Sequence, residues 1–152
     1  MQVVVVRVRG ETFGLPAQHV VEIIRAVAVS PLPGSPAVIS GVINVRGNTV
    51  VVIDPAVRFG KPETPVKPDD NFVLVSTSTR MIAVRVEIAE DLIEIDDATI
   101  TSAKSASSAV EKIRGVAAMP DGALVIYDVG AFLTQAEDEA IARALASTSV
   151  AT

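Results

Sequence analysis

A weak internal repeat constrains this chain more than any other feature of its sequence. A glycine, an apolar segment, a polar turn, a second apolar segment and an aspartate occur in that order at 41–54 and again at 115–128. The apolar segment 13–15 also matches 82–84. The copies share few identical residues, so the repeat is one of pattern. It predicts two related lobes, each closing about five short strands into a small barrel that hides its edges.

The composition favours strands within these lobes. Apolar residues make up 49% of the 152 residues and charged residues 20%, which is enough apolar material for a folded core. Valine dominates the apolar set and aromatic residues are only 3%. Because β-branched side chains suit a pleated, half-buried surface, the fold class predicted is mainly β.

Turn and cap residues predict where the elements lie. Expected strands cover 2–8, 12–15, 42–45, 49–53, 72–76, 81–87, 92–95, 115–119 and 123–127. Asp54 followed by Pro55 predicts the start of a short helix, and Asp128 predicts the start of a C-terminal helix that runs to about Ala146. The Ser- and Ala-rich stretch 101–108 predicts a flexible loop.

The proline-rich stretch 60–70 is the best candidate for a boundary between lobes. The predicted division therefore assigns residues 14–68 to lobe one and residues 1–13 and 69–152 to lobe two. At this length one compact domain containing both lobes is the expected organisation.

Charge and targeting signals restrict the function classes. The net charge of −5 argues against a nucleic-acid partner, because phosphate backbones repel an acidic protein. The absence of cysteine excludes disulfides, thiol catalysis and cysteine-based zinc sites. No signal peptide and no apolar run long enough to span a bilayer is present, so we expect a cytoplasmic protein that does not insert into a membrane.

A search for catalytic groups finds structural interpretations for each candidate. His19, the single histidine, has no acidic or basic neighbour to tune it. The carboxylates between Glu87 and Asp97 fit a solvated strand edge better than a metal or acid–base site. Asp54 and Asp128 are explained as helix caps. We therefore predict no catalytic residue, no metal site and no cofactor.

The turn that contains Arg46 and Gly47 is more informative. It lies at the tip of a predicted hairpin, where Gly47 supplies the positive φ that such a turn needs. Arg46 carries a planar group of donors suited to carboxylates or carbonyls on a partner, and no residue near it in sequence neutralises it. An exposed arginine at a turn can equally serve solubility alone.

The sequence around this turn resembles a known family. Residues 41–47 read Gly-Val-Ile-Asn-Val-Arg-Gly, and apolar residues then lead to Asp54 and to Arg58-Phe59-Gly60. This pattern resembles the core signature of the CheW-like family. Residues 13–16, 20–24, 113–116 and 124–128 extend the resemblance over nearly the whole chain. Pro55 and the turn Pro120-Asp121-Gly122 depart from the family pattern.

The resemblance implies a single CheW-like domain of two five-stranded SH3-like β-barrel lobes packed on a shared core. Family members are adaptors without enzymatic activity. They bind the regulatory domain of a CheA-type histidine kinase and the cytoplasmic tip of a methyl-accepting chemotaxis receptor. In the family, the receptor's helical hairpin lies in the groove between the lobes. Positions that match family binding residues are Val20, Glu22, Gly41, Asn44, Arg46 and Gly47, some of which orient the loop.

Three functions fit these features to different degrees. The first is a chemosensory adaptor in the cytoplasm, held at membrane receptor arrays through its partners. The second is a divergent CheW-like regulator, of a pilus or developmental pathway, that binds the kinase without coupling it to a receptor. The third is a small enzyme or ligand-binding protein that uses the acidic segment 87–97, which the absent catalytic motifs disfavour.

Overall fold

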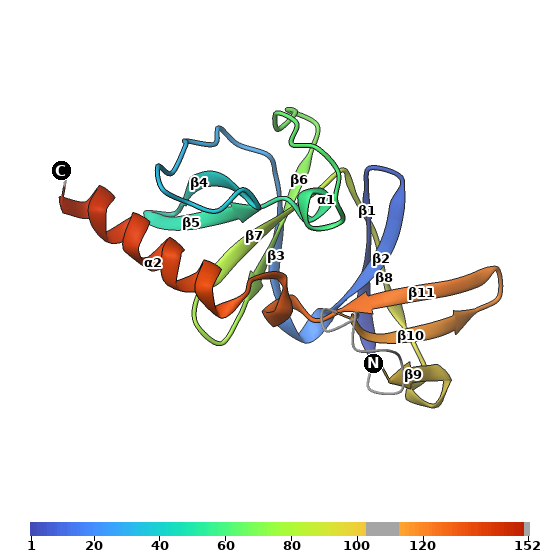
Figure 1. Ribbon diagram of the computed structural model, residues 1–152. Helices are drawn as coiled ribbons and strands as arrows, with labels where there is room; N and C mark the ends of the chain where they lie inside the picture. Colours follow the sequence, from blue (N-terminus) through green and yellow to red (C-terminus); the bar gives the residue numbers. More distant parts are fainter. Residues whose placement is uncertain (103–112, 151–152) are drawn as a thin grey trace.

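Two β-sheet lobes and a C-terminal helix make up the computed structural model, which describes residues 1–102 and 113–150 (Figure 1). One sheet has the order β3-β6-β7-β5-β4 and the other the order β8-β1-β2-β11-β10-β9. The predicted mainly β architecture with short helices and a C-terminal helix is confirmed. The predicted loop 101–108 lies, from residue 103 on, outside the described residues.

The elements have the following bounds. The five-stranded sheet contains β3 (Val20–Arg25), β4 (Ile39–Val45), β5 (Asn48–Ile53), β6 (Asn71–Ser76) and β7 (Met81–Val86). The six-stranded sheet contains β1 (Gln2–Val8), β2 (Glu11–Pro16), β8 (Ile88–Glu94), β9 (Ile100–Ser102), β10 (Ile113–Met119) and β11 (Gly122–Tyr127). The helices are η1 (Ala17–His19), α1 (Pro55–Arg58), η2 (Asp97–Thr99), η4 (Val129–Phe132) and α2 (Gln135–Val150).

Strand registers confirm the internal repeat. In the β4–β5 pair a bulge lies between Ile39 and Gly41, and in the β10–β11 pair the corresponding bulge lies between Ile113 and Gly115. Val52 pairs in parallel with Ala83. Its match in the second copy, Ile126, pairs in parallel with Gly14, which is the match of Ala83. The two copies therefore share their hydrogen-bonding pattern as well as their residue pattern.

The two copies exchange strands. The first copy consists of β1 to β5, yet β1 and β2 pair with β8 and β11 of the second copy. Conversely, β6 and β7 of the second copy pair with β3 and β5 of the first. We define lobe one as the five-stranded sheet with residues 17–86, and lobe two as the six-stranded sheet with the described residues 1–16, 87–102 and 113–132.

The predicted division of the chain is therefore corrected. Residues 69–86, assigned to lobe two, form β6 and β7 of lobe one, and residues 14–16 belong to β2 of lobe two. The proline-rich stretch 60–70 connects α1 to β6 inside lobe one, so its composition marks a loop and no boundary between lobes. β5, which leads into α1, and β6, which follows the loop, both pair with β7, so the chain enters and leaves this segment from one sheet.

The lobes share one apolar core. The largest cluster of buried side chains draws on both lobes, for example Phe13 and Val6 of lobe two with Ile53 and Ile82 of lobe one. Each lobe also has a smaller cluster of its own, one around Phe72 and one around Ile126. Because the main cluster spans the junction, burial of its valines and isoleucines stabilises the contact between lobes as well as each barrel.

Aromatic side chains gather where the lobes meet. Tyr127 lies with its ring centroid 5.0 Å from that of Phe13, 5.4 Å from that of Phe59 and 5.8 Å from that of Phe132. Burial, with a smaller effect of the Glu11 carboxylate, raises the pKa of the Tyr127 hydroxyl. Pairs of aromatic rings stabilise a fold by more than their buried area alone, so these ring contacts stabilise the junction between the lobes.

The C-terminal helix begins later than its cap residue predicts. Asp128 accepts a hydrogen bond from the Gly130 N–H and caps the short η4 turn, and α2 begins only at Gln135. Thr134 and Glu137 exchange side-chain-to-backbone hydrogen bonds of 3.1 and 2.8 Å, which is a capping box. The Asp128 signal is thus correct for a helical turn but wrong for α2, whose start is set by Thr134.

Candidate functional site

The hairpin between β4 and β5 places Arg46 at its tip. Val45 pairs with Asn48, so Arg46 and Gly47 alone form the turn. Both have positive φ, 49° and 88°, which is the type I′ geometry of two-residue hairpins. The Asn44 side-chain oxygen accepts a 2.8 Å hydrogen bond from the Gly47 N–H and fixes the turn. Asn44 and Gly47 therefore shape the loop that presents Arg46.

Arg46 is held by Glu22, a pairing the sequence did not reveal. Its Nη1 and Nη2 donate to the two carboxylate oxygens of Glu22 at 3.3 and 2.5 Å. Glu22 lies on β3 and Arg46 at the end of β4, and these two strands are opposite edges of the five-stranded sheet. The ion pair therefore connects the two edge strands of the sheet, β3 and β4. The Arg46 side chain stays 69% exposed, so it is oriented by Glu22 and still open to solvent.

Titration of Glu22 should report this pair directly. The hydrogen bond from Arg46 lowers the pKa of the Glu22 carboxyl, and the same bond raises the pKa of Arg46. A lowered folded-state pKa means that the pair is complete above the ordinary glutamate value and is lost as pH falls through the lowered pKa. We expect carbonyl-detected NMR to find the Glu22 pKa below its ordinary value and to find it restored in Arg46→Ala. An identical Glu22 titration in both proteins would contradict the pairing.

Gly41 and Val20 have structural explanations. Gly41 has a φ of 150°, and a Cβ there would lie 2.2 Å from the Ser30 carbonyl oxygen. Ser30 exchanges two backbone hydrogen bonds with Val42, at 2.9 and 2.8 Å, so this approach is fixed. Val20 is half-buried and packs against the shared core. Of the six predicted binding residues, Arg46 and Glu22 are therefore the ones that offer charged groups at the surface.

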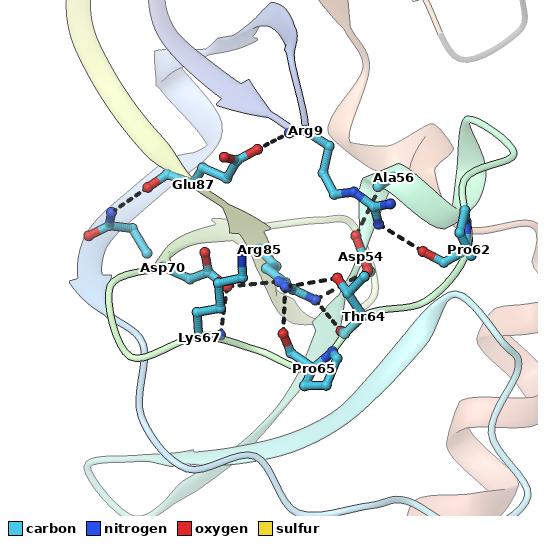
Figure 2. Close-up of polar contacts among 11 residues, drawn as sticks. Arg9, Asp54, Ala56, Pro62, Thr64, Pro65, Lys67, Asp70, Arg85 and Glu87 are labelled. Carbon is cyan, nitrogen blue, oxygen red and sulfur yellow. Dashed lines mark hydrogen bonds and ion pairs between the residues drawn. The ribbon is translucent and has the colours of Figure 1, made fainter.

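A second Arg-Gly turn, Arg9-Gly10, is used inside the molecule. Its positive φ angles, 50° and 86°, lie within 2° of those of the Arg46 turn. Arg9 Nη1 donates to the Pro62 carbonyl at 2.7 Å, and the Arg9 N–H donates to Glu87 (Figure 2). Lys61 in turn donates to the Arg9 carbonyl at 2.7 Å. This turn ties lobe two to the loop of lobe one, whereas the Arg46 turn faces outward.

Arg85 anchors the loop 60–70 of lobe one from the protein interior. Its guanidinium lies between the carboxylates of Asp70, at 3.1 Å, and Asp54, at 3.4 Å (Figure 2). It also donates to the Thr64 carbonyl at 2.6 Å and the Pro65 carbonyl at 2.9 Å. All three charged side chains are at most 8% exposed. Asp54 is thus both the predicted cap of α1, bonded to the Ala56 N–H, and a buried partner of Arg85.

Lobe two lacks the arginine of lobe one. The position that corresponds to Arg46 in the second copy is Pro120, and Asp91 corresponds to Glu22. Other carboxylates of the acidic segment have local partners: Glu90 pairs with Arg7 at 2.6 Å, and Glu94 with the Met1 ammonium at 3.1 Å. The two ends of the molecule therefore differ in charge, and the arginine hairpin belongs to lobe one.

The residues considered for metal binding or catalysis do not form a site in the described structure. No group of three histidines and carboxylates within residues 1–102 and 113–150 is arranged to hold a metal ion. His19 lies at the surface beside Gln18. In the same described ranges, no helix has the length and apolar character needed to cross a bilayer. The described residues thus form two packed β-sheet lobes, with the exposed Arg46 hairpin on lobe one.

Comparison with known proteins identifies the family. The family model described as the CheW-like domain matches residues 2–137, so the chain belongs to the CheW-like family, a family of scaffold proteins. It is similar to the probable chemotaxis protein CheW of Rhizobium etli, with 27% identity over 91% of both chains. It is also similar to protein FrzA of Myxococcus xanthus, with 28% identity over 90% of this chain and 88% of FrzA.

A solved structure supports the fold. The scaffolding protein TtCheW from Thermoanaerobacter tengcongensis superposes with a TM-score of 0.77 and 24% identity, over 90% of this chain and 89% of that protein. With the family match, this similarity confirms the predicted fold class of two SH3-like β-barrel lobes.

Proposed function

We propose that this chain is a chemosensory adaptor that couples the cytoplasmic tip of a methyl-accepting receptor to a CheA-type histidine kinase. Membership of the CheW-like family and similarity to proteins named chemotaxis protein CheW support an adaptor of this kind. The observation that carries the proposal is the exposed, pre-oriented Arg46 hairpin on a rigid two-barrel body. In this function the protein acts in the cytoplasm and joins membrane receptor arrays only through its partners.

The geometry suits recognition of a helical partner. A receptor tip presents carboxylates and amide oxygens along its helices, and a guanidinium binds such groups through charge-assisted hydrogen bonds. Glu22 engages two of the Arg46 nitrogens and holds the side chain in place. Little side-chain freedom is then lost on binding, which strengthens association for the same contacts. The kinase would meet another surface of the two lobes, so that one rigid body connects both partners.

Reversal of the charge at Arg46 tests the proposal. Arg46→Glu removes the charge-assisted donors and sets a second carboxylate beside Glu22. We expect receptor-dependent kinase stimulation to fall by roughly 10- to 100-fold, which corresponds to about 1.5–3 kcal/mol of lost contacts. The measurement is the phosphorylation rate in a mixture of adaptor, kinase and receptor fragment.

A matched control is Arg7→Glu, because Arg7 is also a surface arginine in an ion pair but lies on lobe two. Its stimulation should stay close to that of the unmodified protein. Equal losses in both variants would indicate a general effect of charge, and unchanged stimulation by Arg46→Glu would remove the role given to the hairpin.

The alternative is a regulator that binds the kinase without coupling it to a receptor. The missing arginine in the second copy, where Pro120 replaces it, shows that the two equivalent turns of this chain differ. Separate binding measurements with the kinase regulatory domain and with the receptor fragment distinguish the two functions. Binding to the kinase alone would favour the regulator.

A further inference from the structure

The loop 60–70 of lobe one is bonded to lobe two near its beginning. Arg9 Nη1 donates to the Pro62 carbonyl at 2.7 Å, and Lys61 Nζ donates to the Arg9 carbonyl at 2.7 Å (Figure 2). Lys61 Nζ also lies 3.7 Å from the carboxylate of Glu11 on β2. The side chains of Lys61 and Glu11 are 31% and 62% exposed, so this attachment lies at the surface.

The same loop is bonded to the interior of lobe one two residues later. Arg85 donates to the carbonyls of Thr64 and Pro65, and it is itself held between two buried carboxylates (Figure 2). Buried ion pairs of this kind lose much stability when one partner is removed, whereas exposed contacts are weakened by water and salt. The attachment to lobe one is therefore the permanent one, and the attachment to lobe two is the one that can be lost.

The chain between the two attachments is short and stiff. Only Glu63 separates the carbonyl of Pro62, which Arg9 binds, from the carbonyl of Thr64, which Arg85 binds. Pro62 and Pro65 have fixed φ angles, and a residue that precedes a proline is restricted to extended conformations. An arginine of lobe two and an arginine of lobe one are thus joined through a segment that bends little.

This connection restricts what the shared apolar core leaves free. Apolar burial holds the lobes together but has no preferred direction, whereas hydrogen bonds require a defined distance and angle. A further hydrogen bond between the lobes runs from Arg58 on α1 to the Phe132 carbonyl at 3.0 Å. Two directional contacts at separate points fix a rotation that burial alone does not.

We propose that the loop 60–70 is a latch that fixes the angle between the two lobes, and that Arg9 closes it. Loss of the Arg9 bond frees the angle without unfolding either lobe, because each lobe keeps its own sheet and the loop keeps its bonds to Arg85. In the proposed function, this angle determines how the receptor-binding and kinase-binding surfaces are oriented towards each other. That consequence rests on the proposed function, whereas the latch itself does not.

A distance measurement between the lobes tests the latch. The chain has no cysteine, so Ser78→Cys and Asp121→Cys place one spin label on an exposed turn of each lobe. We expect one narrow distance by electron paramagnetic resonance, and its replacement by a broad distribution in Arg9→Asn. Asparagine tolerates the positive φ of this position but lacks the guanidinium. The matched control is Arg7→Asn, which removes an ion pair confined to lobe two and should keep the narrow distance.

A second measurement tests the consequence for coupling. In a mixture of adaptor, kinase and receptor fragment, Arg9→Asn should lower receptor-dependent kinase stimulation by about 2- to 30-fold, the range for residues that couple distant sites. The Kd for the kinase and the Kd for the receptor fragment, each measured alone, should stay unchanged, because the variant alters the angle between the lobes and leaves each lobe intact. Arg7→Asn should stimulate like the unmodified protein.

The outcomes separate the latch from the proposed function. A distribution in Arg9→Asn as narrow as that in Arg7→Asn would overturn the latch and leave the proposed function untouched. A broad distribution with unchanged stimulation would show that the angle has no part in coupling. If the unmodified protein fails to stimulate the kinase, the proposed function is wrong and the distances still decide about the latch. Lys61→Met, which removes the second bond to lobe two, gives the same test if Arg9→Asn loses thermal stability.

Discussion

Replacement of Arg85 by leucine should lower the thermal midpoint of unfolding by about 6–20 °C. The substitution keeps an apolar side chain but leaves Asp54 and Asp70 buried without a cation, at 3% and 3% exposure. Removal of one partner from a buried ion pair costs about 3–5 kcal/mol, and a protein of this size loses about 2–4 °C for each kcal/mol. The loop 61–70 should also lose its anchor, because the carbonyls of Thr64 and Pro65 accept hydrogen bonds from Arg85. Calorimetry measures the first effect, and hydrogen exchange of the loop measures the second.

Two further variants make this prediction specific. Arg7→Leu removes an arginine from a surface ion pair, for which the expected cost is below about 1 kcal/mol. Addition of Asp54→Asn and Asp70→Asn to Arg85→Leu removes the orphaned charges and should recover part of the lost stability, because asparagine can still cap α1. A midpoint for Arg85→Leu close to that of Arg7→Leu would show that the buried charges are not coupled as described.

Gly41→Ala should also be strongly destabilising, by about 2–6 kcal/mol, for two reasons that add. A backbone angle of 150° in φ costs about 1–3 kcal/mol for a residue with a side chain, and overpacking of a closed site adds a similar amount. The added Cβ meets the carbonyl oxygen of Ser30 at 2.2 Å, and this backbone atom is fixed by its pairing with Val42. Urea unfolding of the variant gives the free energy of unfolding directly.

Gly10→Ala is the matched control for this substitution. Gly10 also has a positive φ, 86°, but a Cβ there meets nothing within 4 Å. Only the cost of a left-handed backbone conformation, about 1–2 kcal/mol, should therefore remain. If Gly41→Ala unfolds no more readily than Gly10→Ala but loses partner binding, Gly41 contacts the partner directly and the backbone explanation is wrong.

Local and repeated patterns made much of this fold predictable. The matches Gly41 with Gly115 and Phe13 with Ile82 correctly paired the strands of the two copies, because a bulge and a parallel pair each leave a residue signature. The exchange of strands between copies was not predictable in the same way. Each strand could pair with the equivalent strand of either copy. Because both copies have the same residue pattern, the sequence does not indicate which of the two strands it pairs with.

The site shows the same limit at the level of single residues. Local backbone preferences predicted a turn at residues 46–48 with a positive φ at Gly47, whereas the positive φ of Arg46 and the pairing of Asn48 with Val45 were not predicted. Glu22, the partner of Arg46, lies 24 residues earlier in the chain, on the opposite edge strand of the sheet. Local sequence patterns do not predict which edge strands come together when a sheet closes into a barrel. Arg85 could have been found from sequence, because a lone arginine within an otherwise apolar strand requires buried acidic partners. Asp69-Asp70, just before the preceding strand, was the signal for them.

The exchange of strands also fixes the order in which a nascent chain can complete its two lobes. All strands of lobe one lie within residues 20–86. In contrast, β1 and β2 can pair with β8 and β11 only after these later strands have been synthesised, and β11 ends at Tyr127. Lobe one is in effect inserted into lobe two. Once it has folded, it brings the ends of its own segment together, where the Glu87 N–H donates to the Arg7 carbonyl at 2.9 Å. Closure of this loop of about 70 residues would otherwise cost lobe two roughly 3–4 kcal/mol. The valine-rich hairpin of β1 and β2 is therefore synthesised before lobe one but pairs with β8 and β11 only after lobe one is complete.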